Sequence, residues 1–242
     1  MLDSLVIIPT YNEKENIEKM IRTVHGLTKD FHVLIVDDGS PDGTAQIVKN
    51  LQKEFPESLH IEEREGKLGL GTAYIHGFKW GLEKGYDFIF EMDADFSHPV
   101  DKLPELYKAC AKDGYDFSIG SRYVKGGAVS NWDKKRLFLS QMASLYSRII
   151  LWVKVKDTTA GFMCYSRKVL ETMDLDKIKF IGYAFQIEMK YTAIRLGFKP
   201  KEVPITFKDR EFGTSKMDVS TLVNYNKSVE CGFILTCNIT CI

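Results

Sequence analysis

Two aspartates behind an apolar segment, Asp93 and Asp95, are the residues of this sequence whose types and spacing point most clearly to chemistry. They follow residues 88–92, which have the pattern of a buried strand. Residues i and i+2 of an extended segment face the same side, so the two carboxylates converge on one point. Such a pair suits a hard cation, Mg²⁺ or Mn²⁺, whose coordination substrate phosphate oxygens would complete. We favour this metal site over the alternative, a solvated loop after the strand.

Acidic and aromatic residues also follow the first two apolar runs of the chain. Tyr11 and Glu13 come shortly after residues 5–8, and the adjacent pair Asp37 and Asp38 comes after residues 32–36. A turn that caps the next helix explains the glycines and the proline after Asp38. It does not explain two adjacent carboxylates, which could instead accept hydrogen bonds from a base or a ribose. Both interpretations remain open.

Basic residues follow other expected strand ends. Arg122 comes directly after the run at 116–119, and Arg210 and Lys216 come after the late run at 202–207. A single basic side chain on a loop is usually solvated. Three of them near sheet ends, beside two carboxylates and a metal, favour anion binding instead.

The glycine-containing and metal-like patterns elsewhere are incomplete. Gly69-Leu70-Gly71 begins a dinucleotide fingerprint, but Tyr74 stands where the third glycine belongs, and Thr72 stands where a P-loop requires lysine. A tight helix start is the simpler interpretation, and nucleotide contact is the alternative. The histidines lack ligand spacing, and we expect His98 to shape the loop after Asp95. The cysteines form no CxxC pair, which argues against zinc.

The elements that must position these residues alternate along the first half of the chain. Apolar runs predict buried strands at residues 5–8, 32–36, 59–61, 87–92 and 116–119. Segments of helical period predict helices at residues 16–24, 44–55, 72–84 and 103–111. This alternation predicts an α/β fold with a mostly parallel sheet, helices on both faces and ligands at the carboxyl ends of the strands.

The second half is less regular. It predicts a long helix over residues 133–155, a helix over 185–196 and a strand over 202–207, whose Pro204 suggests a sheet edge. The long helix has an apolar face formed by Phe138, Met142, Leu145, Ile149 and Trp152. We expect this face to pack in the core, with contact to a membrane or a partner as the alternative.

Composition limits the possible classes of protein. The 242 residues carry 33 basic and 33 acidic side chains, and 44% are hydrophobic. This balance argues against disorder and against a dedicated nucleic-acid binder. No run of about 18 apolar residues predicts a membrane span. The five irregularly spaced cysteines suit a reducing compartment, so we expect a cytoplasmic protein that can still lie on a membrane surface.

The order and content of the motifs resemble a known family. The motifs are PTYNE (9–13), VDDGSPDGT (36–44), KLGLGTAYIHG (67–77), MDADFSHP (92–99), GSRY (120–123), TAGFMCYSR (159–167) and VPITFKDREFGTSKM (203–217). Together they look like the polyprenyl-phosphate mannosyltransferases, also called dolichol-phosphate mannose synthases, of glycosyltransferase family 2. The resemblance covers about residues 3–217 and implies a GT-A fold. Its late FKDREFGTSKM block is similar to this subgroup rather than to the polysaccharide-building enzymes of family 2.

The resemblance also implies roles for individual residues. The guanosine of GDP-mannose would be held by residues of the first two strand ends, namely Pro9, Tyr11, Glu13, Val36 and Asp38. The metal and the sugar diphosphate would be bound by Asp93, Ala94 and Asp95. The diphosphate and the incoming lipid phosphate would be contacted by Arg122, Arg210 and Lys216. Some relatives have a glutamine metal ligand two positions after the second aspartate, where this chain has Ser97.

The reaction implied by the resemblance is an inverting transfer of mannose from GDP-mannose to a polyprenyl (dolichyl-type) phosphate. A phosphate monoester has a second pKa of ~6, so the acceptor oxygen is already anionic near neutral pH and needs no general base. The main tasks would be positioning and charge neutralisation, with Asp95, Arg122, Arg210 and Lys216 as catalytic residues.

Two other functions remain as alternatives. One is a family-2 enzyme that uses another nucleotide sugar or a hydroxyl acceptor. A hydroxyl acceptor would need a carboxylate base. The sequence lacks the Gln-x-x-Arg-Trp motif of polysaccharide synthases, which argues against this alternative. A non-enzymatic nucleotide-sugar binder would be expected to lack Asp93, Asp95 or the late basic residues, and all are present.

We expect a GT-A catalytic domain over residues 1–217 and an atypical tail over residues 218–242. The tail has three of the five cysteines, a weak helical period and no membrane-spanning run. The expected partners are therefore GDP-mannose, a polyprenyl phosphate, a membrane contacted peripherally at its cytosolic face and, as an option, a membrane-anchoring partner subunit. No nucleic acid is expected.

Overall fold

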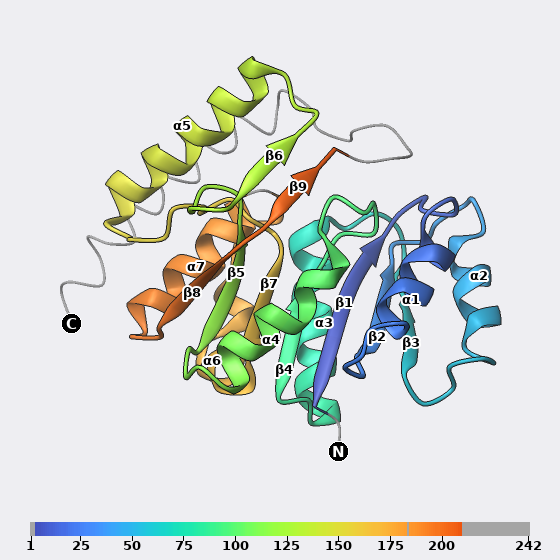
Figure 1. The fold of residues 1–242 in the computed structure, drawn as a ribbon. Coiled ribbons are helices and arrows are strands. Elements are labelled where there is room, and N and C mark those ends of the chain that lie inside the picture. The colour runs from blue at the N-terminus through green and yellow to red at the C-terminus, as the bar shows by residue number, and fades with distance from the viewer. Residues whose placement is uncertain (1–2, 183, 210–242) are drawn as a thin grey trace.

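A computed structural model describes residues 3–182 and 184–209 of the chain (Figure 1). Its strands are β1 (Ser4–Thr10), β2 (His32–Asp37), β3 (Leu59–Glu63), β4 (Phe88–Glu91), β5 (Phe117–Ser121), β6 (Ala128–Ser130), β7 (Met163–Ser166), β8 (Pro200–Pro204) and β9 (Thr206–Lys208). Its α-helices are α1 (Ile17–His25), α2 (Thr44–Leu51), α3 (Leu70–Lys84), α4 (Leu103–Ala111), α5 (Lys134–Leu151), α6 (Arg167–Thr172) and α7 (Ala184–Arg195). Short 3-10 turns cover Val100–Lys102 and Leu175–Lys177. Arg210, Lys216 and the predicted tail lie outside the described residues.

The central sheet has seven strands in the order β3-β2-β1-β4-β7-β5-β8. β1 pairs in parallel with β2 and β4, β2 with β3, and β5 with β8, while β7 runs antiparallel between β4 and β5. In register, Thr10 lies beside Asp37 and Ile7 beside Glu91, so β1, β2 and β4 end at the same edge. The predicted α/β fold with a mostly parallel sheet is confirmed.

Apolar side chains fill both faces of this sheet, because successive residues of a strand point to opposite sides. Along β1, Val6 and Ile8 belong to the core cluster that includes residues of α1, α2 and α4. Leu5 and Ile7 belong to the cluster that includes residues of α3, α6 and α7. The helices therefore cover both faces of the sheet, as Figure 1 also shows, and leave the carboxyl edge of the parallel strands for loops.

Two features of the second half differ from the sequence-based expectation. The strand expected over residues 202–207 is two strands, because Pro204 ends β8 and the chain continues into β9, which pairs in parallel with β6. β8 does form an edge of the main sheet, as its proline predicts. The sequence predicts no strand at the position of β7, because a segment of four residues is too short to show a hydrophobic period.

The expectation that the apolar face of the long helix packs in the core is wrong. Phe138, Met142, Leu145, Ile149 and Trp152 are all exposed, from 41% for Leu145 to 92% for Trp152. The buried side chains of α5 are Ser144, Ser147 and Leu151. Ser147 Oγ lies 2.6 Å from Thr158 Oγ1, so small hydroxyl side chains allow the helix to pack closely against the loop before β7. The larger apolar side chains then face outward.

α5 is the longest described helix, at 18 residues, and its charged residues are Lys134, Lys135 and Arg136 at the N-terminal end and Arg148 near the C-terminal end. Within residues 3–182 and 184–209, no helix combines the length and hydropathy that a bilayer span requires.

The turn between β5 and β6 allows a test of how closely the backbone packs in this fold. Gly127 donates its backbone N–H to Val124 O (2.9 Å), and a Cβ at Gly127 would lie 2.6 Å from Ser121 O and 2.7 Å from Arg122 O. Both are main-chain atoms, so relief requires the backbone to move. We expect Gly127→Ala to lower the free energy of unfolding by about 2 kcal/mol in urea denaturation.

Gly182→Ala is the matched control, because no atom lies within 4 Å of a Cβ there. It should change the same quantity by less than about 1 kcal/mol. Equal effects of the two substitutions would show that the turn at Gly127 does not constrain the fold.

Candidate active site at the carboxyl edge of the sheet

The sheet topology brings the predicted site residues of the described part of the chain to one edge. Tyr11 and Glu13 follow β1, Asp38 follows β2, and Asp93 and Asp95 follow β4. Arg122 follows β5, which is parallel to β8 and separated from β4 only by β7. Because β7 is antiparallel, its N-terminal end lies at the same edge and brings the loop at residues 157–162 into the site.

The loops after β1 and β2 are tied together by the carboxylates of Asp37, which is buried, and Asp42, which is half-buried. Asp37 Oδ1 accepts hydrogen bonds from Thr10 Oγ1 (2.8 Å) and Ser40 Oγ (2.6 Å). Asp42 accepts from the backbone N–H groups of Lys14 and Thr44, each at 3.0 Å. Of the two adjacent aspartates, Asp37 is thus a loop-organising residue. The predicted nucleoside residues Pro9 and Val36 lie side by side in the β1–β2 register, with Val36 buried in the core.

Asp38 holds the glycine-containing segment before α3. Arg64 Nη2 lies 2.6 Å from Asp38 Oδ1, and the backbone N–H of Leu68 donates to Asp38 Oδ2 (3.2 Å). Arg64 Nη1 also donates to Thr72 Oγ1 (3.0 Å) in the first turn of α3. Gly69 has a φ of 102°, which only glycine adopts readily, so this segment is the tight helix start that the sequence suggested. A carboxylate has about four acceptor positions, so Asp38 keeps capacity for a ligand.

Asp93 and Asp95 lie at different depths in the loop after β4. The Asp93 side chain is 37% exposed, and Tyr74 Oη donates to its Oδ1 at 3.3 Å. Burial, together with the charge of Asp93, raises the pKa of Tyr74 well above its ordinary value, so the hydroxyl stays a donor. Asp95 is buried and accepts from the backbone N–H of Ser97 at 3.1 Å. Ala94 between them is buried too.

The two carboxylates offer hard oxygen ligands, which fit Mg²⁺ or Mn²⁺. Within the described ranges, no cluster of three or more histidine, cysteine, aspartate or glutamate side chains forms a complete metal site. A cation at this position would therefore need further oxygens from a ligand or water, as is usual where a metal binds a substrate diphosphate.

Arg122 is held in a fixed orientation by Asp157. Its Nε and Nη2 donate to the two Asp157 oxygens, each at 2.7 Å, and its backbone N–H donates to Oδ2 at 2.9 Å. Nη2 also donates to Thr159 Oγ1 (2.7 Å). Burial alone would raise the pKa of Asp157, but the hydrogen bonds and charge of Arg122 hold this pKa below its ordinary value. The pair is bidentate, the geometry that orients a guanidinium most strongly.

Two further groups surround this ion pair. The rings of Tyr123, Trp132 and Phe207 lie 5.1–5.7 Å from the Arg122 guanidinium carbon. Glu202 on β8 accepts from the backbone N–H groups of Lys156 (2.9 Å) and Asp157 (3.0 Å). Glu202 on the edge strand β8 therefore holds the loop that contains Asp157, and Asp157 in turn orients Arg122.

A buried polar network lies behind the aspartates. Glu91 on β4 accepts a hydrogen bond from Gln186 Nε2, and Lys190 Nζ donates to Ala160 O (2.5 Å) and Gln186 O (3.0 Å). Burial raises the pKa of Glu91 and lowers the pKa of Lys190. Both shifts favour the uncharged forms, which limits the net charge beneath the site.

Sequence reasoning missed several residues that shape this edge: Arg64, Tyr74, Asp157, Gln186, Lys190 and Glu202. Gln186 and Lys190 carried a usable signal, because polar side chains four residues apart on a buried helix face need partners in the core. Asp157 carried none, because its partner Arg122 is 35 residues away in the chain.

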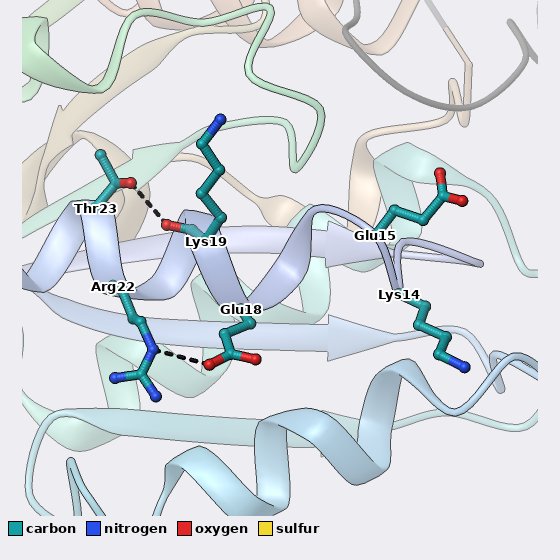
Figure 2. Close-up of a pocket in the computed structure, with 6 residues that line it drawn as sticks. All are labelled: Lys14, Glu15, Glu18, Lys19, Arg22 and Thr23. Carbon is teal, nitrogen blue, oxygen red and sulfur yellow. Dashed lines mark hydrogen bonds and ion pairs between the residues drawn. The ribbon is translucent and has the colours of Figure 1, made fainter.

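A separate hollow lies along α1 and the turn before it (Figure 2). It is lined by Lys14, Glu15, Glu18, Lys19, Arg22 and Thr23. Figure 2 shows Arg22 directed at Glu18, and Nε–Oε1 is 2.9 Å. Lys19 Nζ lies 4.7 Å from the centre of the Phe96 ring, so this charged surface borders the loop after β4 without including any predicted site residue.

Comparison with solved structures identifies the class of this fold. Glucosyl-3-phosphoglycerate synthase of Mycobacterium tuberculosis superposes with a TM-score of 0.66 at 18% identity, over 98% of this chain and 80% of that one. The mannosyltransferase PcManGT of Pyrobaculum calidifontis, solved with GDP-Man and Mn²⁺, superposes with a TM-score of 0.61 at 16% identity, over 94% of this chain and 64% of that one. The fold is the GT-A fold of glycosyltransferases.

Sequence comparison gives the family. The glycosyl transferase family 2 pattern matches residues 5–174. The polyprenol monophosphomannose synthase of Mycolicibacterium smegmatis is 49% identical over 219 residues, which are 90% of this chain and 82% of that protein. The undecaprenyl-phosphate mannosyltransferase of Micrococcus luteus is 46% identical over 213 residues, 88% of this chain and 86% of that protein. The chain belongs to glycosyltransferase family 2, the family to which the predicted resemblance points.

The Arg122–Asp157 pair gives a test of the site geometry. The side chains are only 8% and 0% exposed, so Asp157→Asn removes the counter-charge that Asp157 supplies to a buried guanidinium. We expect the free energy of unfolding to fall by about 3 kcal/mol. Glu18→Gln, which breaks the exposed pair with Arg22, is the control and should leave the unfolding midpoint nearly unchanged.

The double variant Arg122→Met/Asp157→Leu should recover part of the loss, because it removes both charges together. A loss that is purely additive across the two positions would contradict a coupled ion pair.

Proposed function

We propose that this protein transfers a mannosyl group from GDP-mannose to a polyprenyl phosphate with inversion at the anomeric carbon. The observation that supports this most is the similarity to two polyprenyl-phosphate mannosyltransferases, at 49% and 46% identity over 90% and 88% of this chain. The aspartate pair after β4 and the anchored Arg122 are the groups such a reaction needs, a metal-diphosphate site and a fixed cation. GDP-Man in the solved PcManGT complex, a protein of the same fold, agrees with this donor.

Asp93 and Asp95 would hold Mg²⁺ or Mn²⁺, which when bound would stabilise the charge that develops on the departing diphosphate. The nucleoside would lie at the ends of β1 and β2, where Tyr11 is accessible and Lys67 Nζ lies 5.3 Å from its ring centre. The donors N1–H and N2–H of guanine suit a carboxylate such as Asp38 or Glu13. Pro9 and Val36 would contribute backbone atoms to this pocket.

Arg122 would contact the phosphates with a guanidinium group that Asp157 holds in one orientation. Because the bidentate pair fixes the guanidinium plane before any ligand arrives, its charge needs no reorganisation during the reaction. Arg210 and Lys216, which lie outside the described residues, are proposed as the other cations that hold the two anionic substrates together. The acceptor oxygen is already anionic, so no residue of the chain needs to remove a proton.

We further propose that α5 contacts the membrane that contains the lipid acceptor. Phe138 and Ile149 on this helix are more than 60% exposed, and Lys134, Lys135 and Arg136 stand at its N-terminus. An apolar face flanked by basic residues suits the headgroup boundary of an anionic bilayer. Tyr123 Oη donates to Ser140 Oγ (2.7 Å), so α5 packs beside Arg122, where a lipid phosphate would arrive.

Transfer of label from radiolabelled GDP-mannose to polyprenyl phosphate, followed by organic extraction, tests the function. We expect lipid-soluble, acid-labile label, and Asp95→Asn should reduce the rate at least 10²-fold because it removes a metal-binding charge while keeping the bond from Ser97. Asp176→Asn, at an exposed carboxylate that pairs with Lys79, is the control and should retain the rate.

Label in a water-soluble glycan would support a hydroxyl acceptor. Binding of GDP-mannose without transfer would support a non-enzymatic binder. Either result would contradict the proposed reaction.

Vesicle flotation tests the proposed membrane contact. Phe138→Ser/Ile149→Ser should weaken partition into vesicles of phosphatidylcholine and phosphatidylglycerol at least 10-fold, because each buried side chain contributes about 1.5–3 kcal/mol. Leu196→Ser is the control, since Leu196 is 47% exposed at the end of α7. An equal loss in the control, or no loss in the double variant, would rule out α5 as the contact.

A further inference from the structure

His98 lies directly behind the aspartate pair and is only 3% exposed. Its imidazole stacks on Phe162, with ring centres 5.0 Å apart and an angle of 10°, and meets Phe207 edge-on at 5.6 Å. Phe162 immediately precedes β7 and Phe207 is on β9, so two separate parts of the fold grip the ring. The ring plane and both nitrogen positions are therefore fixed by packing.

Both nitrogens of this ring face Asp93. The backbone N–H of Asp93 donates to His98 Nδ1 at 3.1 Å, and His98 Nε2 lies 3.8 Å from Asp93 Oδ2. An Nδ1 that accepts a hydrogen bond places the hydrogen of the ring on Nε2, on the side of the carboxylate. This assignment follows from the hydrogen-bond pattern.

The other oxygen of the Asp93 carboxylate, Oδ1, also has a neighbouring side chain. Tyr74, fully buried on α3, donates from Oη to Asp93 Oδ1 at 3.3 Å. Tyr74 thus binds the carboxylate of Asp93 and His98 binds its backbone N–H, while His98 Nε2, at 3.8 Å from Oδ2, is too far away for a hydrogen bond. Its neighbour Asp95 is oriented by a different group, the backbone N–H of Ser97.

We propose that His98 is a positioning residue for the divalent-cation site: it accepts a hydrogen bond from the main-chain N–H of Asp93 and so fixes where the Asp93 carboxylate meets the cation of a bound nucleoside diphosphate. This inference rests on the proposed function, because that function supplies the cation. Groups that orient metal ligands typically change metal affinity 10–100-fold when they are replaced. A role in packing alone would require only a flat side chain between Phe162 and Phe207.

Two amide substitutions distinguish these roles. The amide oxygen of asparagine occupies the position of Nδ1, whereas the amide of glutamine reaches the position of Nε2. His98→Asn can therefore keep the bond from the Asp93 N–H, and His98→Gln cannot. Both variants remove the ring from between the phenylalanines, so loss of stacking is common to the pair and should lower their melting temperatures alike.

The first measurement is calorimetric affinity for Mn²⁺ in the presence of GDP, with the full chain. We expect His98→Gln to weaken Mn²⁺ binding at least 10-fold and His98→Asn to weaken it less than about 3-fold. GDP affinity in EDTA should be equal in the two variants, because the nucleoside residues are unchanged. Equal Mn²⁺ affinities in the two variants would overturn the proposal.

The second measurement needs no ligand and separates this proposal from the function on which it rests. Hydrogen exchange of the Asp93 amide should stay slow in His98→Asn and become at least 10-fold faster in His98→Gln. If the wild-type protein takes up no Mn²⁺ with GDP, the proposed function fails and this exchange comparison decides whether His98 positions Asp93. Unchanged exchange in His98→Gln would overturn the positioning role.

Discussion

Charge at the carboxyl edge of the sheet is the constraint on which the rest of this structure depends. The parallel strands bring several aspartates to one edge of the sheet. Partly buried anions at such short separations are stable only where each has hydrogen-bond donors or a counter-charge. Asp37 has Thr10 and Ser40, Asp38 has Arg64, Asp157 has Arg122, and Asp93 has Tyr74. Thr10, Arg64, Arg122 and Tyr74 come from segments distant in the chain from the carboxylates they bind, so the interactions that make these charges tolerable also fix the loops of the site.

The second half of the chain supports this edge and adds an exposed apolar helix beside it. Antiparallel β7 turns its preceding loop back to the site, and Glu202 on the edge strand β8 holds that loop through two backbone N–H groups. α5 packs on the same loop with small hydroxyl side chains and presents Phe138 and Ile149 outward. A fixed cation beside the site and an exposed apolar helix are thus consequences of one packing arrangement, which suits a reaction between a water-soluble donor and a lipid phosphate.

The sequence predicts most of the first half and little of the second. The alternation of apolar runs and helical segments is enough for β1 to β5, and the i, i+2 spacing after β4 is enough to single out Asp93 and Asp95. The outward orientation of α5 was not predictable, because the apolar period is the same whether the face meets a core or a membrane. Arg64 and Asp157 depend on contacts between segments distant in the chain, which leave no local pattern. His98 was expected to shape its loop, but its stacking between Phe162 and Phe207 does not show in the sequence.

The most direct test of the proposed site is a crystal structure of the protein with GDP and Mn²⁺, with anomalous diffraction used to locate the metal. We expect one manganese bound by Asp93 and Asp95 and by the diphosphate, with the guanosine at the ends of β1 and β2 beside Tyr11 and Asp38. Manganese at another position, or GDP bound away from this edge of the sheet, would contradict it.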